Sequence, residues 1–252
     1  MSARRSNQKH LGKVPLERAF SKLGLASRSQ AKQWIIEGRV RVDGVVRKDP
    51  FFLVVPEFAK LRLNDQKAKP SVWRTVMLYK PKGVVTTRSD EHGRPTVFSL
   101  LKQEDGYLHP VGRLDMATTG LLLLTNDTKL SSWLTDPYNK VQRLYVVTVK
   151  GLVTEQEVQT MLKGIKDKGE LLKADKVNVR KASGRESRLT LELTEGKNRE
   201  IRRMFDCLEH EVMSLKRVAF GDLQLGTLKP GEYRTVTKQE IIKAFGPIGL
   251  KD

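Results

Sequence analysis

The residues best suited to chemistry lie in the segment HPVGRLDMATTGLLLLTND, residues 109 to 127. It places Arg113 and Asp115 in a predicted loop, directly before a predicted apolar strand. An ionised carboxylate can act as a nucleophile or stabilise a cation that forms beside it. In an isolated R-L-D sequence, however, the aspartate usually caps a turn and the arginine is usually a surface cation. The segment makes Asp115 a candidate catalytic residue and needs support from the rest of the chain.

Other common catalytic motifs are missing from the sequence. It contains no G-x-x-x-x-G-K-[ST] phosphate loop, no G-x-G-x-x-G and no G-x-S-x-G. Cys207 is the only cysteine, which excludes an internal disulfide and a cysteine zinc cluster, and the four histidines lack the i, i+4 spacing of a zinc helix. We therefore expect an enzyme that works with carboxylates, tyrosines and cations, without a cofactor and without a metal.

The charge balance favours a nucleic acid as the partner. The chain has 47 Lys and Arg against 29 Asp and Glu, a net charge of +18, and a protein this basic releases counterions when it binds a polyanion. An anionic membrane is the competing partner, but we find no amphipathic or lipidated anchor. Apolar runs such as Leu121 to Leu124 are far shorter than the ~18 residues of a membrane span.

The N-terminal segment 1–13 is basic and lacks the hydrophobic region of a secretory signal. A mitochondrial presequence is an alternative, but the segment is short and shows no apolar face. We predict a disordered arm that contacts RNA, and we expect the protein in a reducing compartment, the cytoplasm.

Two helices and a hairpin are predicted over residues 14–63. Pro15 suits the start of the first helix, Ser27 and Gln30 form an S-x-x-Q capping box for the second, and Asp43-Gly44 is a two-residue hairpin turn. Most runs of charge are simply solvated, but six cations with few acids between them favour a phosphate-binding surface. These cations are Arg28, Lys32, Arg39, Arg41, Arg47 and Lys48.

This unit also resembles a known RNA-binding domain. The run GLASRSQAKQWIIEGRVRVDGVV is similar to the S-R-x-x-A…I-x-x-G-x-V-x-V-(D/N)-G pattern of the S4-like domains. The resemblance covers roughly residues 14 to 63 and implies a module that docks on RNA. Within it, we expect Arg28, Lys32, Arg39 and Arg41 to bind RNA.

The sequence pattern changes after this unit. Residues 64–75 are polar, contain a proline and are predicted to form a linker. From residue 76 to 252, strand-like runs alternate with helical patterns without a regular βαβ rhythm, which predicts an α+β domain on a mixed, largely antiparallel sheet flanked by helices. The predicted strands include 76–79, 121–125, 144–149 and 189–193, and a helix is predicted over 198–208.

Four segments of this second domain resemble, in order and spacing, the motifs of the pseudouridine synthases that act on ribosomal RNA. The segment 109–127 is similar to that family's G-R-L-D-x-x-(T/S)-x-G-L-L-L-x-T-x-D motif. The other three are YKPKGVVTT with DEHGRPTVFSLL (79–101), QRLYVVTVKG (142–151), and LTEGKNREIRRMFDCLEHEVMSLKRVAFGDLQL (193–225). With the S4-like unit, the resemblance covers nearly the whole chain after residue 14.

The resemblance implies roles for three catalytic residues. Asp115 would attack C1′ of the ribose or stabilise the cation that forms there. Tyr145 would lie against the uracil and help to remove the C5 proton, although a tyrosine packed in the core remains an alternative for the proton role. Arg202 matches the position that pairs with the catalytic aspartate. Arg199 or Arg203 could serve instead, and otherwise each is expected to contact phosphate.

The remaining predicted site residues bind RNA. The target uridine must leave its stack, and Arg113 is a candidate to fill the vacated space. Lys197 is predicted to anchor the RNA backbone, and Lys80 and Lys82 are predicted to steer it, contributing affinity and salt dependence rather than specificity.

Two other functions remain open on the sequence. One is a catalytically idle RNA-binding or ribosome-assembly factor, which the presence of Asp115, Tyr145 and Arg202 disfavours. The other is a synthase acting on transfer RNA, which the S4-like unit disfavours. The expected partner is ribosomal RNA or an assembling ribosomal subunit, the expected process is ribosome biogenesis, and a monomer suits an enzyme that embraces a large RNA. The sequence identifies neither the uridine nor the ribosomal subunit.

Overall fold

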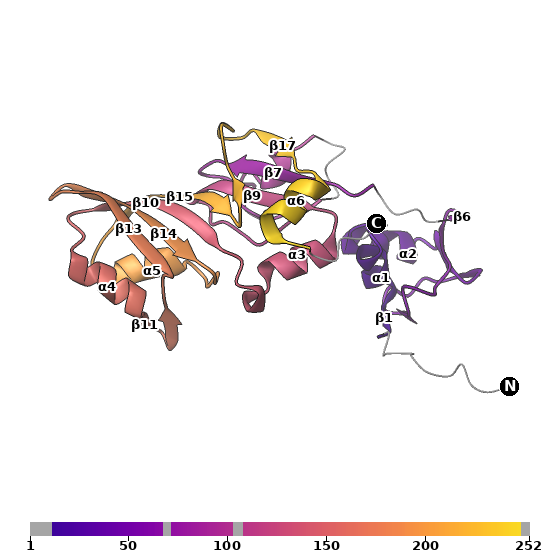
Figure 1. Ribbon diagram of the computed structural model, residues 1–252. Coiled ribbons are helices and arrows are strands. Elements are labelled where there is room, and N and C mark those ends of the chain that lie inside the picture. Colours follow the sequence, from indigo (N-terminus) through magenta and orange to yellow (C-terminus); the bar gives the residue numbers. More distant parts are fainter. Residues whose placement is uncertain (1–11, 68–71, 103–107, 248–252) are drawn as a thin grey trace. The chain divides into compact units, whose positions relative to one another are not determined.

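The structure is a computed structural model that describes residues 12–67, 72–102 and 108–247 (Figure 1). The chain divides into two compact units, Met1–Trp73 and Arg74–Asp252, and this division falls inside the segment 64–75 that the sequence predicts as a linker. Of the predicted N-terminal arm, only residues 12 and 13 lie within the described residues. No helix in the described ranges is long and apolar enough to cross a membrane.

The N-terminal unit contains the two predicted helices and the predicted hairpin. The side chain of Ser27 caps the second helix by accepting a hydrogen bond from the backbone N–H of Gln30 at 3.2 Å. Asp43 and Gly44 both have positive φ, as a tight hairpin turn requires. The elements are β1 (Val14–Pro15), α1 (Leu16–Lys22), α2 (Arg28–Ile36), β2 (Val40–Val42), β3 (Val45–Val46), β4 (Leu53–Val54), β5 (Leu61–Leu63) and β6 (Gln66–Lys67).

One boundary of this unit differs from the prediction. The strand β6 lies inside the predicted linker, because Asn64 and Asp65 adopt positive φ and turn the chain back to pair with β5. Polar residues in a tight hairpin and in a linker look alike in sequence. Leu16 and Phe20 lie on one face of α1. Together with Ile35 of α2 and the inward-facing residues of β2 and β5, they form the buried core of the unit.

The C-terminal unit is built on a nine-stranded sheet in the order β13-β14-β10-β15-β9-β7-β17, with β16 beside β15 and β8 beside β9. The pairing of β15 with β9 is parallel and the other pairings are antiparallel, which confirms the predicted α+β class. The strands are β7 (Thr75–Lys80), β8 (His109–Pro110), β9 (Thr119–Thr125), β10 (Arg143–Lys150), β13 (Lys176–Ala182), β14 (Glu186–Leu193), β15 (Val212–Phe220), β16 (Leu223–Gln224) and β17 (Tyr233–Thr235).

Helices and a small hairpin surround this sheet. The helix α4 begins with a complete capping box formed by Thr154 and Glu157. The predicted helix over 198–208 is observed as α5. The elements are η1 (Val97–Leu100), α3 (Thr128–Thr135), η3 (Pro137–Asn139), α4 (Glu155–Lys163), the hairpin of β11 (Ile165–Asp167) and β12 (Glu170–Leu172), α5 (Glu200–Cys207) and α6 (Lys238–Phe245).

The alternation of side chains along the strands determines which residues face the helices α4 and α5. Val147 of β10 and Leu191 of β14 point to one face, where they pack against Phe205 of α5 and against residues of α4. The helices α4 and α5 lie together on this side of β13, β14 and β10 (Figure 1). Tyr145 follows on the same face and also contacts the core around Leu78 and Leu122. It therefore lies where the two apolar clusters of the unit meet.

Gly120 permits the parallel contact between β9 and β15. It has φ +105° and pairs with Arg217, and a Cβ atom there would lie 2.1 Å from the Arg217 carbonyl oxygen. No side chain fits at that distance, so the backbone of β9 reaches β15 only because this residue is glycine. The strand joint fixes the end of the loop that carries Asp115.

We predict that Gly120→Ala lowers the free energy of unfolding by at least about 2 kcal/mol, because of backbone overlap and an unfavourable φ. Gly184→Ala is the control, since Gly184 has open space around it and no positive φ. The control should stay within about 0.5 kcal/mol of the wild type. Urea unfolding measures both, and equal stabilities for the two variants would contradict the role of Gly120.

Candidate active site

The loop between β8 and β9 holds Asp115 by its backbone. Leu114 is buried, and its backbone is clamped by Thr86, whose hydroxyl donates to the Leu114 carbonyl at 2.7 Å and accepts from its N–H at 3.3 Å. The Met116 carbonyl accepts from the N–H of Gly83 at 2.9 Å, and the Asp115 carbonyl accepts from the N–H of Thr118 at 3.0 Å. These bonds satisfy the loop backbone and leave the half-buried Asp115 carboxylate free to face a cleft.

Lys80 is a fully buried cation beneath this loop. Its ammonium donates to the carbonyl oxygens of Thr118 at 2.8 Å, Pro81 at 3.1 Å and Met116 at 3.4 Å. Burial lowers its pKa to about 8, and the nearby negative charge of Asp115 partly opposes that shift. The prediction that Lys80 steers RNA is therefore wrong, because its charge is used inside the protein. Lys82 is exposed and stays a candidate.

The cleft in front of Asp115 has a volume of about 710 Å³, within the range of pockets that hold small organic ligands. Its walls come from the Asp115 loop, β10, β15 and the segment 193–202. Cations dominate the charged lining, with two acids besides Asp115 among them. The charged residues of the lining are Arg113, Asp115, Arg143, Glu195, Lys197, Arg199, Glu200, Arg202 and Arg217.

Tyr145 forms part of the cleft wall. It lies on β10 between Leu191 of β14 and Arg217 of β15, and it is half-buried. Its ring contacts both apolar clusters of the unit, as a core tyrosine would, yet it also lines the cleft. The structure therefore places one aromatic face and one phenol at the same opening as Asp115.

Arg202 reaches the Asp115 loop from α5. Its guanidinium donates to the Ala117 carbonyl at 3.3 Å and to the Val212 carbonyl at 3.4 Å. Burial lowers the pKa of Arg202, and Arg199 acts in the same direction, while Asp115 raises it. Among the described side chains, Arg202 forms no direct ion pair with Asp115, because the two carbonyls hold its guanidinium. The predicted pairing of Arg202 with Asp115 is thus a longer-range electrostatic interaction in this conformation, without a hydrogen bond between the two side chains.

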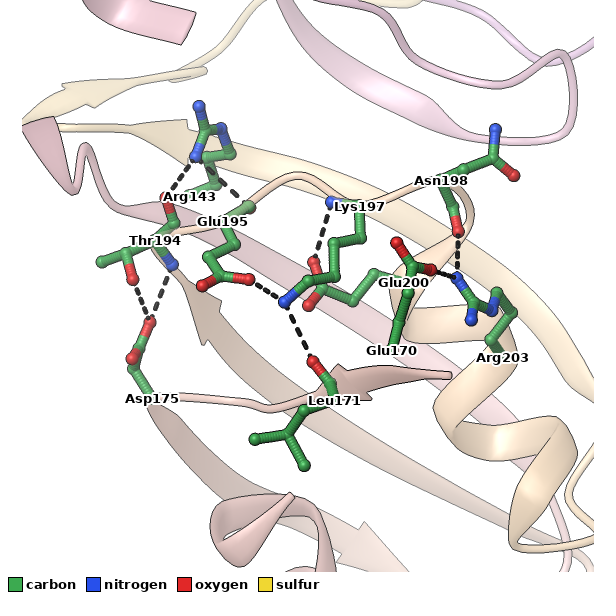
Figure 2. A network of polar contacts seen from close by, with 10 residues as sticks. All are labelled: Arg143, Glu170, Leu171, Asp175, Thr194, Glu195, Lys197, Asn198, Glu200 and Arg203. Carbon is green, nitrogen blue, oxygen red and sulfur yellow. Dashed lines mark hydrogen bonds and ion pairs between the residues drawn. The ribbon is translucent and has the colours of Figure 1, made fainter. Parts of the chain in front are cut away.

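Two predicted RNA-binding cations are tied to the hairpin β11–β12 instead. Arg203 donates to Asp167 and Glu170, each at 2.5 Å, and is largely buried. Figure 2 shows it between Glu170 and the Asn198 carbonyl. Because these partners occupy its donors, the prediction that Arg203 contacts phosphate is wrong for this conformation.

Lys197 belongs to the same polar network (Figure 2). Its ammonium donates to the Leu171 carbonyl at 2.9 Å and to the carboxylate of Glu195. Its backbone N–H donates to Glu200 at 3.1 Å, and burial raises the pKa of that glutamate. The predicted RNA anchor is therefore a brace that connects the segment before α5 to β12.

The other predicted cations fall into two groups. Arg113 and Arg199 are exposed at the cleft, and Arg199 takes a left-handed conformation with φ 49° at the start of α5. In the N-terminal unit, Arg28 and Lys32 are exposed on α2, and none of the hydrogen bonds and ion pairs described there involves their side chains. Arg39 and Arg41, by contrast, pair within that unit. Arg39 donates to Glu37 and Asn64, and Arg41 donates to Asp65.

Sequence reasoning missed two arginines in the cleft wall. Arg143 is 7% exposed and donates to the carbonyls of Val141, Leu134, Thr194 and Glu195. Arg217 is 3% exposed and donates to the Leu121 carbonyl at 2.8 Å, while its buried Nη2 has no partner among the described residues. The available signal was the alternation along the strands, which places each arginine on the same face as Tyr145.

No group of three or more His, Cys, Asp or Glu side chains in the described ranges could hold a metal ion. The cleft brings together the Asp115 carboxylate, the Tyr145 phenol and several guanidinium groups held by backbone carbonyls. Such a set can stabilise positive charge at Asp115 and bind an anionic ligand around it.

Comparison with known proteins gives a consistent result. The family model described as RNA pseudouridylate synthase matches residues 74–206, and the S4 domain model matches residues 16–57. An uncharacterized RNA pseudouridine synthase of Aquifex aeolicus (strain VF5) is 34% identical, over 94% of this chain and 96% of that protein. The ribosomal large subunit pseudouridine synthase B of Bacillus subtilis (strain 168) is 33% identical, over 90% of this chain and 93% of its own length.

A solved structure also covers most of the chain. The crystal structure of a pseudouridylate synthase superposes with a TM-score of 0.66 at 30% identity, and covers 92% of this chain and 99% of that one.

The burial of Lys80 predicts a pH dependence of stability. The folded-state pKa of about 8 lies below the ordinary value of 10.5, so the unfolded chain binds more protons between these values and stability rises with pH. Relative to Lys80→Met, the wild type should gain about 2 to 3 kcal/mol in free energy of unfolding from pH 7 to pH 10. Urea unfolding at both pH values measures this gain. Lys82→Met is the matched control and should show no such difference, and a gain of zero for Lys80 would contradict its burial.

Proposed function

The chain belongs to the RNA pseudouridylate synthase family, and from that membership we propose that it isomerises a uridine of ribosomal RNA to pseudouridine with Asp115 as the catalytic carboxylate. The observation that carries the catalytic assignment is the position of Asp115, half-buried at a cleft lined by arginines. The large-subunit activity named for the Bacillus subtilis relative supports ribosomal RNA as the substrate. A cytoplasmic, monomeric enzyme of ribosome biogenesis is part of the same proposal.

The reaction needs no cofactor and no energy source. The C1′–N1 bond breaks, the uracil leaves with the electron pair, and the base turns so that C5 forms the new bond to C1′. The proton on C5 is then lost and N1 gains one, so atoms and charge balance. Asp115 either bonds to C1′ during this exchange or stabilises the cation that forms there.

Tyr145 is proposed to hold and deprotonate the base. Its position between the two apolar clusters gives it a fixed ring on which a uracil can stack. Its phenol opens on the same cleft as Asp115 and is proposed to take up the C5 proton while its own hydroxyl proton passes to N1, directly or through water.

The fixed arginines of the cleft are proposed to supply the positive field. The guanidinium of Arg202 interacts with the Asp115 carboxylate through space. Within the described part of the chain, the Nε of Arg202 and the Nη2 of Arg217 are buried donors without a protein partner. Unused buried donors are unfavourable unless a ligand or water accepts from them. The carbonyl oxygens of uracil and the flanking phosphates are suitable acceptors.

Access to the cleft requires the target nucleotide to leave its stack. Arg113 is exposed two residues before Asp115, and we propose that it enters the space that the base leaves. Lys82 and Arg199 are exposed and are proposed to contact the adjoining backbone.

The sequence left two rival functions open, an idle assembly factor and a transfer RNA synthase. The open carboxylate, the phenol and the arginines in one cleft favour an active enzyme over an idle one. Mapping pseudouridines in total RNA from cells with and without this protein distinguishes ribosomal from transfer RNA.

Asp115→Asn is expected to lower single-turnover conversion of uridine in ribosomal RNA by at least about 10³-fold, because an amide is neither a nucleophile nor an anion. Its RNA affinity should stay within about twofold of the wild type, since the phosphate contacts are unchanged. The control is Asp222→Asn, which alters an exposed acid outside the cleft. Full activity in Asp115→Asn, with normal thermal unfolding, would refute the catalytic role.

Arg28→Gln/Lys32→Gln is expected to weaken binding of ribosomal RNA and to reduce the slope of log K against log salt by up to about 2, with the rate at saturating RNA unchanged. The matched control is Lys163→Gln/Lys243→Gln, which removes the same charge from exposed sites on α4 and α6. Equal salt slopes in the two double variants would show that only net charge matters, and that α2 is not an RNA contact.

A further inference from the structure

The hairpin of β13 and β14 forms one edge of the nine-stranded sheet. The two strands are antiparallel and join through residues 183–185. On β14, Leu189, Leu191 and Leu193 pack into the core under α4 and α5. Arg188 and Thr190 alternate with them and therefore point to the opposite face. Figure 1 shows no described helix over β13 and β14 on that side.

Two lysines on this open face each lie opposite a glutamate of β14, whereas a third lysine lies opposite an arginine. Lys176 lies opposite Glu192 and forms an ion pair at 3.8 Å, and Lys150 lies opposite Glu186. Opposite charges across neighbouring strands stabilise a sheet. Lys181, however, lies directly opposite Arg188. Two like charges at such a pair of positions destabilise it.

Two further arginines accompany this pair. Arg180 occupies the irregularity between Val179 and Lys181, where a bulge adds a residue to the strand and re-aims its side chains. Arg185 lies in the connection to β14. All four cations are exposed, and within the described part of the chain none of them forms an ion pair. We call Arg180, Lys181, Arg185 and Arg188 the hairpin cluster.

An uncompensated cluster of this kind gains stability from an anion. Arginine and lysine suit phosphate, which arginine can bind in a bidentate manner. Val179 is the only large apolar side chain of these two strands that is exposed, and the cluster contains no aromatic ring for base stacking. These features fit a phosphate backbone, read by charge, better than single-stranded bases or an apolar protein partner.

We propose that the hairpin cluster is a second RNA contact of the C-terminal unit, which binds the phosphate backbone of the substrate RNA away from the nucleotide in the cleft. Arg188 lies five residues along β14 from Leu193, which lines the cleft, so their backbone positions are about 17 Å apart along the strand, and their side chains point to opposite faces of the sheet. An RNA that continues from the cleft would reach the hairpin cluster by passing around the sheet edge formed by β13. This inference rests on the proposed function, because it names where the same RNA continues.

The test is Lys181→Gln/Arg188→Gln in the full chain, with unmodified large-subunit ribosomal RNA transcribed in vitro as the probe. The variant should bind about tenfold more weakly at 0.1 M salt, and its salt slope should fall by about 1.5 to 2. Single-turnover conversion at saturating RNA should equal that of the wild type. Removing a like-charged pair should not lower the thermal unfolding temperature, so a folding defect is not expected.

Lys163→Gln/Lys243→Gln again serves as the control for net charge. If it changes affinity and salt slope as much as the hairpin variant does, or if the hairpin variant binds like the wild type, the hairpin cluster is not an RNA contact and the proposal is overturned. If the hairpin variant binds RNA normally but no longer binds an acidic protein, the proposal is also overturned. A wild-type protein that converts no uridine would instead overturn the proposed function, so the two failures are distinguishable.

Discussion

The buried ammonium of Lys80 is the interaction on which the geometry of the cleft depends. It belongs to the last residue of β7 and donates to the carbonyl oxygens of Met116 and Thr118, which follow Asp115 in the loop, and to that of Pro81. Gly120 fixes the end of that loop where β9 meets β15. A carboxylate in such a loop has few conformations left, so it does not lose entropy when a nucleotide arrives. Because Lys80 binds backbone atoms, it also leaves the oxygens of Asp115 available for chemistry.

The opposite wall of the cleft is held by the same kind of interaction. Lys197, Arg203 and Glu200 connect the segment before α5 to the hairpin β11–β12, so the position of Arg202 is set by residues that never meet the substrate (Figure 2). Charged side chains are stable in such places only when their donors and acceptors are satisfied. Among the residues that the structure describes, none donates a hydrogen bond to the buried Oε1 atom of Glu200, and burial raises the pKa of its carboxyl. A raised pKa favours the neutral form, which is easier to bury.

The sequence predicted the α+β class, the strands β7, β9, β10 and β14, and several residues of the cleft, among them Asp115, Tyr145 and Arg202, because these depend on alternation and on linear motifs. It could not predict which cations are free. Lys80, Lys197 and Arg203 were expected at RNA, but each has a partner 26 to 38 residues away along the chain, at a position that the pattern of charge does not reveal. Arg143 and Arg217 were missed for the converse reason. A strand arginine resembles a surface residue until the register shows that it faces inward.

This division between fixed and free cations bears on how a basic cleft can keep a working carboxylate. Flexible cations around Asp115 would fold onto it, or would be drawn away by the phosphates of an incoming RNA. Arg143, Arg202 and Arg217 can do neither, because backbone carbonyls hold their guanidinium groups. Their field is therefore present before the substrate binds and does not need to reorganise during the reaction, which is the condition under which electrostatic stabilisation is most effective. In the proposed function, exposed cations serve docking, where weak, salt-dependent contacts permit release of the product. The basic side chains of the chain thus have two separate roles in the proposed function, and the burial of each side chain determines which role it has.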